Sequence, residues 1–488
     1  MQCALGWLLL AALLLCPRGR ALAEDASDYY HRGFVKLARG DQDGAIADFT
    51  KAVELQPNYA EAYKNRGIAR SVNQDQEGAI ADYTTAIKLR PVYLEAYFGR
   101  AAARIAKGDR AGAIADYTKC IELQPDSASA HQKRGLIKSA NGDQDGALAD
   151  YNQSIALQPD SAPTYYLRAL AKSAKGDRDG AIADHTKAIE LKPDYADAYL
   201  GRANDRRAQG DIEAALADST RAIELMPNLP SAYLERGNAR SAKGEREGAI
   251  ADYTRAIELK PDFTQAYLNR GLDRQAQADP DGAIADYGKV IQLKPDHAKA
   301  YHLRATVGWE KGDWLGADAD ESKAIQLKPD FAAARLARGC GRFDRHAFSD
   351  ALADLRKVSE TGFRKDYSLL RIWLIRARLG EVTAATAELQ SQWAKRTNGK
   401  PGDWTSQIQR HLCGEIPESQ FLAAAKHSDP KVEAGQICEA YFFAGYKILI
   451  EGDRAKSVDF FQKAVATGKT NFFEYQSAAA ELKRLKTN

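Results

Sequence analysis

A proline recurs at a fixed spacing of 34 residues through most of the chain. The nine prolines follow one another without a single insertion: Pro57, Pro91, Pro125, Pro159, Pro193, Pro227, Pro261, Pro295 and Pro329. When each is counted as position 32 of a unit, residues 26–365 divide into ten units of 34 residues. Position 20 is alanine in every unit, from Ala45 to Ala351, and position 4 is tyrosine in eight of the ten. A period this strict limits the fold to one small motif that is repeated and stacked.

Each unit carries the pattern of two short helices. Positions 4, 8 and 11 share one face of the first helix because they lie three and four residues apart, and positions 20, 24 and 27 do the same in the second. Sequences such as Lys107-Gly108-Asp109 end the first helix with glycine and cap the second with aspartate. The proline at position 32 then ends the second helix. One such hairpin leaves apolar surface bare, so it must stack on its neighbours.

This period and these residues resemble the tetratricopeptide repeat family over residues 26–365. The resemblance implies an all-α fold, a right-handed α-solenoid (superhelix) of helix-turn-helix repeats whose first helices line a concave, protein-binding surface. After residue 365 the pattern weakens. We predict a degenerate repeat at 366–399, a short helical insertion at 400–437, and a final repeat-like unit with a capping helix at 438–488.

The last 90 residues or so carry a second resemblance. Its motifs are Trp404 with Leu412-Cys413-Gly414-Glu415-Ile416, then Cys438-Glu439-Ala440-Tyr441-Phe442-Phe443-Ala444-Gly445, then Asn471-Phe472-Phe473-Glu474-Tyr475 with Glu481-Leu482. They look like the C-terminal region of NlpI-type envelope lipoproteins. That resemblance implies a scaffold that forms a homodimer and holds cell-wall hydrolases or proteases. The chain departs from that type in having many more regular repeats.

The N-terminal residues 1–23 have the pattern of a secretory signal peptide. An apolar run from Ala4 to Cys16 is too short to span a bilayer comfortably, and Ala21-Leu22-Ala23 follows it as a cleavage pattern. We therefore predict cleavage after Ala23 and a secreted or periplasmic protein. The alternative is an outer-membrane lipoprotein lipidated at Cys16, because Leu13-Leu14-Leu15-Cys16 resembles a lipobox. Two alternatives stay open for Cys413 and Cys438. They form a disulfide in an oxidising compartment, or they are two small buried thiols.

Charged residues recur with the repeat. Position 7 is arginine and position 23 is aspartate in all ten units, and position 11 is arginine or lysine in nine. Because a lone buried charge is costly, ten cations at a normally apolar position need anions. We predict a structural ladder between first and second helices that fixes the stacking register. In the middle units its members are Arg202, Arg236, Arg270, Asp218, Asp252 and Asp286. Two other interpretations remain. The arginines form an anion-binding strip along the groove, or the charged residues form a merely solvated face.

The family model places positions 2, 5, 6, 9, 12 and 13 on the concave surface. We call the eleven residues that we select from these positions the groove residues and predict that they bind partners. They are Tyr166, Leu170, Leu200, Asn204, Leu234, Asn238, Leu268, Leu272, His302, Thr306 and Trp309. Leucines supply apolar anchors and side-chain amides can bond a peptide backbone. The competing interpretation is that the leucines only pack between neighbouring helices.

Motifs of known catalytic chemistry are absent from the sequence. It has no HExxH, GxSxG or Walker-type motif, no CxxC pair, and no two of its 8 histidines at metal-ligand spacing on one helix. Lys+Arg 69 against Asp+Glu 66 gives +3, which argues against a nucleic-acid partner. We predict a non-enzymatic scaffold for protein–protein interaction in the bacterial cell envelope, without cofactor or metal. The alternatives are a self-assembling solenoid, with Phe442/Phe443 or Phe472/Phe473 as contact patches, and a regulatory subunit of an envelope hydrolase or protease.

Overall fold

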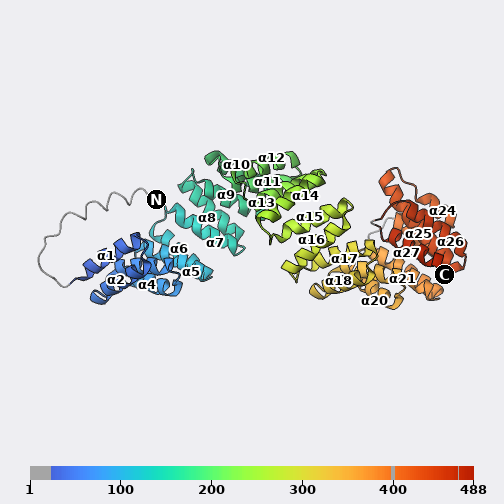
Figure 1. Ribbon diagram of the computed structural model, residues 1–488, viewed down its shortest axis with the longest axis horizontal. Coiled ribbons are helices and arrows are strands. Elements are labelled where there is room, and N and C mark those ends of the chain that lie inside the picture. Colours follow the sequence, from blue (N-terminus) through green and yellow to red (C-terminus); the bar gives the residue numbers. More distant parts are fainter. Residues whose placement is uncertain (1–23, 397–401, 471, 488) are drawn as a thin grey trace. The chain divides into compact units, whose positions relative to one another are not determined.

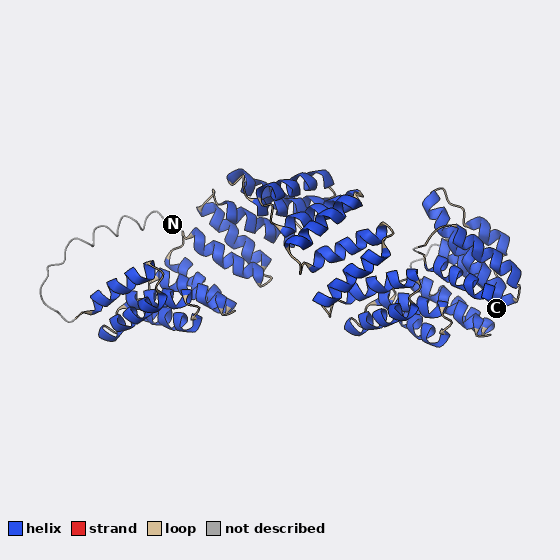
Figure 2. Ribbon diagram, in the orientation of Figure 1, coloured by secondary structure: helices blue, strands red, loops and turns tan. Residues whose placement is uncertain are grey.

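A computed structural model describes residues 24–396, 402–470 and 472–487 of the chain. Over these residues the secondary structure is helical, without a strand (Figure 2). The fold is therefore the predicted all-α solenoid. The predicted signal peptide, with Cys16, lies outside the described residues. The chain forms two compact units, Met1–Pro227 and Asn228–Asn488, and the description below takes each by itself.

The first unit is a series of helical hairpins in which every odd-numbered helix packs on the even-numbered helix that follows it (Figure 1). Its helices are α1 (Ala26–Ala38), α2 (Gln42–Leu55), α3 (Ala60–Val72), α4 (Gln76–Leu89), α5 (Leu94–Ala106), α6 (Arg110–Leu123), α7 (Ala128–Ala140), α8 (Gln144–Leu157), α9 (Ala162–Ala174), α10 (Arg178–Leu191), α11 (Ala196–Gln209) and α12 (Ile212–Leu225).

The second unit continues with four hairpins of the same kind and ends in a different helical arrangement. The hairpin helices are α13 (Pro230–Lys243), α14 (Arg246–Leu259), α15 (Thr264–Ala276), α16 (Pro280–Leu293), α17 (Ala298–Lys311), α18 (Trp314–Leu327), α19 (Ala332–Asp344) and α20 (Phe348–Thr361). The remaining helices are α21 (Lys365–Arg378), α22 (Val382–Ala394), α23 (Trp404–Leu412), α24 (Glu418–Ala424), α25 (Pro430–Glu451), α26 (Arg454–Ala466) and α27 (Phe473–Thr487).

The repeat residues occupy the places that the pattern predicts. Gly108 adopts a left-handed φ of +80° after α5, and the Asp109 side chain accepts a hydrogen bond from the Gly112 backbone at the start of α6. The alanines at position 20 are fully buried or nearly so. At position 8, a methyl group on Gly67 would come within 3.0 Å of the Tyr83 ring. The small residue at position 8 therefore leaves room for the ring of the tyrosine on the second helix of the hairpin.

One predicted boundary near the C-terminus is wrong. The final repeat-like unit was expected to begin at residue 438, but α25 begins eight residues earlier and contains Gly435. Pro430 occupies the first turn, where its missing N–H costs nothing, and the Asp429 side chain caps the backbone N–H of Lys431. The sequence pattern missed this start because it followed the repeat period rather than the cap.

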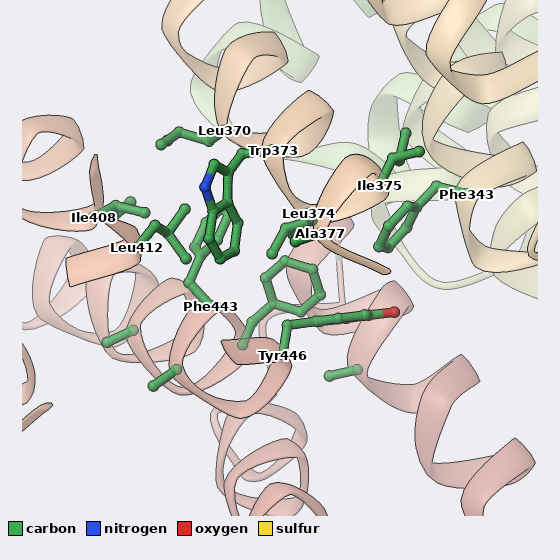
Figure 3. Packing of buried hydrophobic residues seen from close by; sticks show 14 of the residues in the cluster. Phe343, Leu370, Trp373, Leu374, Ile375, Ala377, Ile408, Leu412, Phe443 and Tyr446 are labelled. Atoms are coloured by element: carbon green, nitrogen blue, oxygen red, sulfur yellow. The ribbon is translucent and has the colours of Figure 1, made fainter. Parts of the chain in front are cut away.

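The C-terminal helices share one large apolar core. Trp373 and Leu374 of α21, Leu412 of α23 and Phe443 and Tyr446 of α25 lie side by side in it (Figure 3). Phe442 and Phe443 are both completely buried there. The predicted self-association patch at Phe442/Phe443 is therefore wrong, because apolar rings on an inward face of a helix cannot meet a second molecule.

Candidate partner-binding groove

The predicted ladder forms between the two helices of each hairpin. The Nη2 atoms of Arg202, Arg236 and Arg270 lie 2.7, 2.6 and 2.7 Å from Oδ1 of Asp218, Asp252 and Asp286. Each aspartate also accepts from the position-11 arginine one turn further along, for example Arg206 at 2.7 Å. All three carboxylates are buried. The position-7 guanidinium groups are thus occupied by protein carboxylates, which favours the structural ladder over an anion-binding strip.

The ladder also joins successive repeats within a unit. Arg202 donates through Nη1 to Oγ1 of Thr186 in the preceding hairpin at 3.0 Å, and Arg270 does the same to Thr254 at 3.0 Å. Gly288 replaces this hydroxyl before Arg304, and the Arg304 and Asp320 side chains are more exposed than their counterparts. Because one guanidinium contacts both its own repeat and the previous one, it specifies how the repeats stack.

The groove residues divide into exposed and buried sets. Leu170 and Leu272 are 41% and 37% exposed, and Asn204 is exposed as well. Tyr166, Leu200, Leu234, Asn238, His302 and Thr306 are half-buried. Leu268 and Trp309, in contrast, are only 5% and 6% exposed. Leu268 packs with Tyr287 and Val290, which favours the competing interpretation, packing between helices, for this residue.

The predicted amide contacts are already partly used inside the protein. Asn238 Oδ1 accepts from Asn269 Nδ2 at 2.7 Å and from the Tyr253 hydroxyl at 3.1 Å. Asn204 Oδ1 accepts from Arg207 at 3.0 Å on its own helix. Asn269, in turn, receives a hydrogen bond from Gln265. In the second unit Asn238 and Asn269 join the first helices of two neighbouring repeats, and a partner backbone would have to compete with this hydrogen bond.

The structure does bring three groove residues together in one cavity. His302, Thr306 and Trp309 of α17 line it with Ala333 and Leu336 of α19, and the C-terminal helix α27 adds Phe473 and Gln476. Glu310 of α17, Ala337 of α19, and Phe363 and Arg364 after α20 also line it, and the volume is about 240 Å³. We call this cavity the groove-end pocket. The sequence predicted its α17 side but not its α27 side, because residue 473 is far from residue 302 along the chain.

A buried carboxyl group orients His302 at this pocket. The Nδ1 atom of His302 lies 2.9 and 3.1 Å from the two carboxylate oxygens of Glu321, which is fully buried on α18. The imidazole also packs edge-on against Phe331 at 5.0 Å. Burial raises the pKa of Glu321 to about 7, against the hydrogen bond from His302. Glu321 stands at repeat position 24, where six of the ten units carry phenylalanine or tyrosine, and the sequence analysis missed this departure from the pattern.

We expect the Glu321→Gln variant to lose less stability than the parent as pH rises from about 4.5 to about 7. In this range the unfolded carboxyl releases a proton that the folded one keeps, so the parent becomes less stable with rising pH. Glutamine cannot titrate, and its slope is flatter. Melting temperatures of both proteins across the range test this. Glu360→Gln, at an exposed carboxyl on α20, should leave the parent slope unchanged, and equal slopes for all three proteins would contradict the assignment.

The structure has no disulfide between the two cysteines for which the sequence left that alternative open. Cys413 and Cys438 are both free thiols in the structure. Cys413 Sγ accepts from Gln409 at 3.3 Å, whereas Cys438 is completely buried in the C-terminal core. Burial raises the pKa of the Cys438 thiol to about 12. A protonated thiol in a packed core is a poor nucleophile for disulfide formation.

Neither a metal cluster nor a membrane span is found in the part of the chain that the structure describes. Residues 24–396, 402–470 and 472–487 contain no group of three or more histidine, cysteine or carboxylate side chains that could hold a metal ion. In the same residues, no helix combines the length and apolar character needed to cross a membrane.

Stacked helical hairpins of one fixed length define the class of α-solenoid scaffolds. Family models match along most of the repeats: the tetratricopeptide repeat at residues 268–332, the TPR repeat at 33–71 and 237–275, and the ETO1 C-terminal domain at 61–239. The chain is a tetratricopeptide repeat protein, and such repeats mediate protein–protein interaction.

Comparison with solved structures finds several chains to which this one is similar. MamA is 28% identical over 36% of this chain and 96% of its own, with a TM-score of 0.34. A tetratricopeptide repeat protein from Parabacteroides merdae is 19% identical over 51% and 98%, with a TM-score of 0.42. Yeast Tom70 is 17% identical over 83% and 98%, with a TM-score of 0.37. No curated protein matches the chain.

Proposed function

We propose that this protein is a non-enzymatic scaffold that binds an extended or helical segment of a partner protein along the first helices of its second unit. The observation that carries the proposal is the groove-end pocket. Repeat helices α17 and α19 form one side of it and the C-terminal helix α27 forms another, so the groove ends in a cavity. A cavity at the end of a row of half-buried leucines and amides suits a partner segment with one fixed anchor.

The lining of the pocket indicates what the anchor is. Trp309, Leu336, Phe363 and Phe473 present apolar surface. The polar and charged lining residues are His302, Thr306, Glu310, Arg364 and Gln476. The volume of about 240 Å³ lies below the roughly 300–1,000 Å³ of pockets that hold whole small molecules. The pocket therefore suits one bulky apolar side chain of a partner, with the remaining segment lying on the exposed leucines such as Leu272.

Filling the pocket should abolish partner capture without unfolding the protein. Ala333 is half-buried at the pocket, so Ala333→Trp places an indole where the partner's side chain would lie. Gln326→Trp, at an exposed position of α18, is the matched control. We expect cross-linked partners, identified by mass spectrometry, to be lost with the first variant and kept with the second. Recovery of the same partners by both would contradict groove binding.

The structure also decides which leucines can test the groove. Leu234→Glu changes a half-buried position of the second unit, and Leu272 is more exposed still. Leu268→Glu is unsuitable because it would bury an unpaired charge against Tyr287. A loss of partner capture in Leu272→Glu, with an unchanged melting curve, supports the same proposal.

We place this scaffold in the bacterial cell envelope, secreted or periplasmic after cleavage at Ala23. The support is the sequence of residues 4–23 together with the NlpI-type motifs near the C-terminus. Envelope hydrolases or proteases are then the proposed partners, and this protein is their scaffold or regulatory subunit. The chain is also proposed to form a homodimer, which light scattering of the purified protein tests.

Mass spectrometry of the mature N-terminus tests the location. Cleavage after Ala23 makes Glu24 the first residue of the mature chain, and a peptide that begins there is the expected result. A mature chain that begins at a lipidated Cys16 would instead make this an outer-membrane lipoprotein.

A further inference from the structure

A larger pocket lies among the C-terminal helices, where the last of the ten repeats ends. Its volume is about 700 Å³. Its walls are the N-terminal ends of α21, α23 and α27, the C-terminal end of α22 and the middle of α25. We call it the five-helix pocket. It is lined by the cationic side chains of Arg364, Lys365 and Lys395, and the carboxyl groups of Glu439 and Glu474 lie deeper.

Several charges at this pocket are already balanced inside the protein. Arg396, another lining residue, contacts the carboxylates of Asp366 at 2.6 Å and Asp403 at 2.8 Å, so it joins α21 and α23 to the end of α22. Glu474 is buried and pairs with Arg371 beneath the pocket at 3.3 Å. These groups hold the helices together and leave one net negative charge, because Arg396 opposes two aspartates whereas Arg371 and Glu474 balance each other.

Three cations are left over. Arg364, Lys365 and Lys395 are exposed and make no ion pair with any residue that the structure describes. Glu439 also lines the pocket, and it accepts a hydrogen bond from the Trp404 indole. Burial, followed by the neighbouring charge of Glu474, raises the pKa of Glu439 to about 8, so this carboxyl is largely neutral at pH 7. The five-helix pocket therefore carries an excess of positive charge.

The backbone adds to this preference. Helices α21 and α27 begin at the pocket, and the N-terminal ends of helices favour anions. Arg364 adopts a left-handed φ of 42°, a conformation that non-glycine residues avoid. Arg364 stands at the point where the chain leaves α20 and enters α21.

The two pockets are neighbours, since Arg364 and Phe473 line both of them. A partner segment with its apolar anchor in the groove-end pocket therefore reaches the five-helix pocket within a few residues. We propose that the five-helix pocket binds a run of acidic residues adjoining the apolar anchor of that segment. This inference rests on the proposed function and names its partner chemistry: a bulky apolar residue next to several aspartates or glutamates.

The test uses the full chain and three capped hexapeptides that share their leucines: Leu-Glu-Glu-Leu-Glu-Glu, the same sequence with glutamine, and the same with lysine. Binding is followed by fluorescence anisotropy of a dye on each peptide. We expect the acidic peptide to bind about tenfold more tightly than the glutamine peptide and the lysine peptide not to bind. Raising the salt concentration should weaken only the acidic peptide.

Charge reversal locates the site. Lys365→Glu with Lys395→Glu should remove the tenfold preference, whereas Lys357→Glu with Lys426→Glu, which changes two exposed lysines outside the pocket lining, should keep it. Both double variants alter the net charge equally. Circular dichroism confirms that each is folded. An unchanged preference in the first variant, or no acidic-peptide binding up to millimolar concentration, overturns the inference.

Two further results separate this inference from the proposed function. One result is that the acidic and glutamine peptides bind equally and that Ala333→Trp abolishes the binding of both. The groove-end pocket then binds an apolar anchor, and the inference of an acidic run is wrong. If inorganic phosphate competes fully with the acidic peptide in wild type and itself binds tightly, the five-helix pocket is a site for a small anion, and the peptide assignment is overturned.

Discussion

Replacing Asp218 by alanine is expected to lower the free energy of unfolding by about 3 kcal/mol. Asp218 is 4% exposed and accepts hydrogen bonds from Nε and Nη2 of Arg202 and from Nη1 of Arg206, at 2.9, 2.7 and 2.7 Å. Without the carboxylate, two cations remain close together at a largely buried position with no anion to oppose them. Denaturant titration of the full chain and hydrogen exchange at the amides of α11 and α12 measure the loss.

A surface pair on the same helix is the matched control. Arg221 and Glu224 lie 2.8 Å apart on α12, but both side chains are about half exposed. Glu224→Ala should cost at most about 1 kcal/mol, because solvent and salt screen such pairs. Equal effects of Asp218→Ala and Glu224→Ala would show that the ladder is a solvated face. A triple change of Arg202 and Arg206 to methionine and of Asp218 to leucine should recover most of the stability, because neither cation then remains without its anion.

The repeat part of the molecule could be predicted because its contacts are local. Position 7 meets position 23 sixteen residues later in the same hairpin, as in Arg66 with Asp82 and Arg270 with Asp286. The same offset recurs in all ten units. The pairing could therefore be predicted without knowing which distant segments of the chain meet. The helix caps follow for the same reason, since Asp109 bonds a backbone group only three residues away.

The C-terminal part and both pockets depend on contacts between distant residues. His346 meets Glu481 across 135 residues, and the groove-end pocket joins α17 to α27. No period relates these segments, so the sequence indicates helices there but not which faces meet. The aromatic run Tyr441-Phe442-Phe443 shows the consequence: Phe442 and Phe443 are completely buried, although their sequence is equally typical of an exposed contact patch.

Replacing Arg371 by methionine should destabilise the C-terminal helices by about 4 kcal/mol, the largest effect that we expect of a single change outside the repeats. Arg371 is fully buried on α21. Its guanidinium donates to the Tyr367 hydroxyl at 3.0 Å, to Ser477 Oγ at 2.8 Å and to Glu474 at 3.3 Å, and it lies over the rings of Phe343, Tyr367 and Phe442. Methionine leaves the Glu474 carboxylate buried and without its cation, so α27 should lose protection from hydrogen exchange before the repeats do.

Three further variants separate charge, geometry and packing at this position. Arg371→Lys keeps the charge but cannot donate in a planar fork to three partners, so its loss should lie between those of wild type and Arg371→Met. Combining Arg371→Met with Glu474→Gln removes the unpaired carboxylate and should recover roughly half of the lost stability. Arg356→Met, at an exposed arginine of α20, should change little. If Arg371→Met unfolds at the same denaturant concentration as Arg356→Met, the buried guanidinium does not hold α27 against α21, and the closure of both pockets needs another cause.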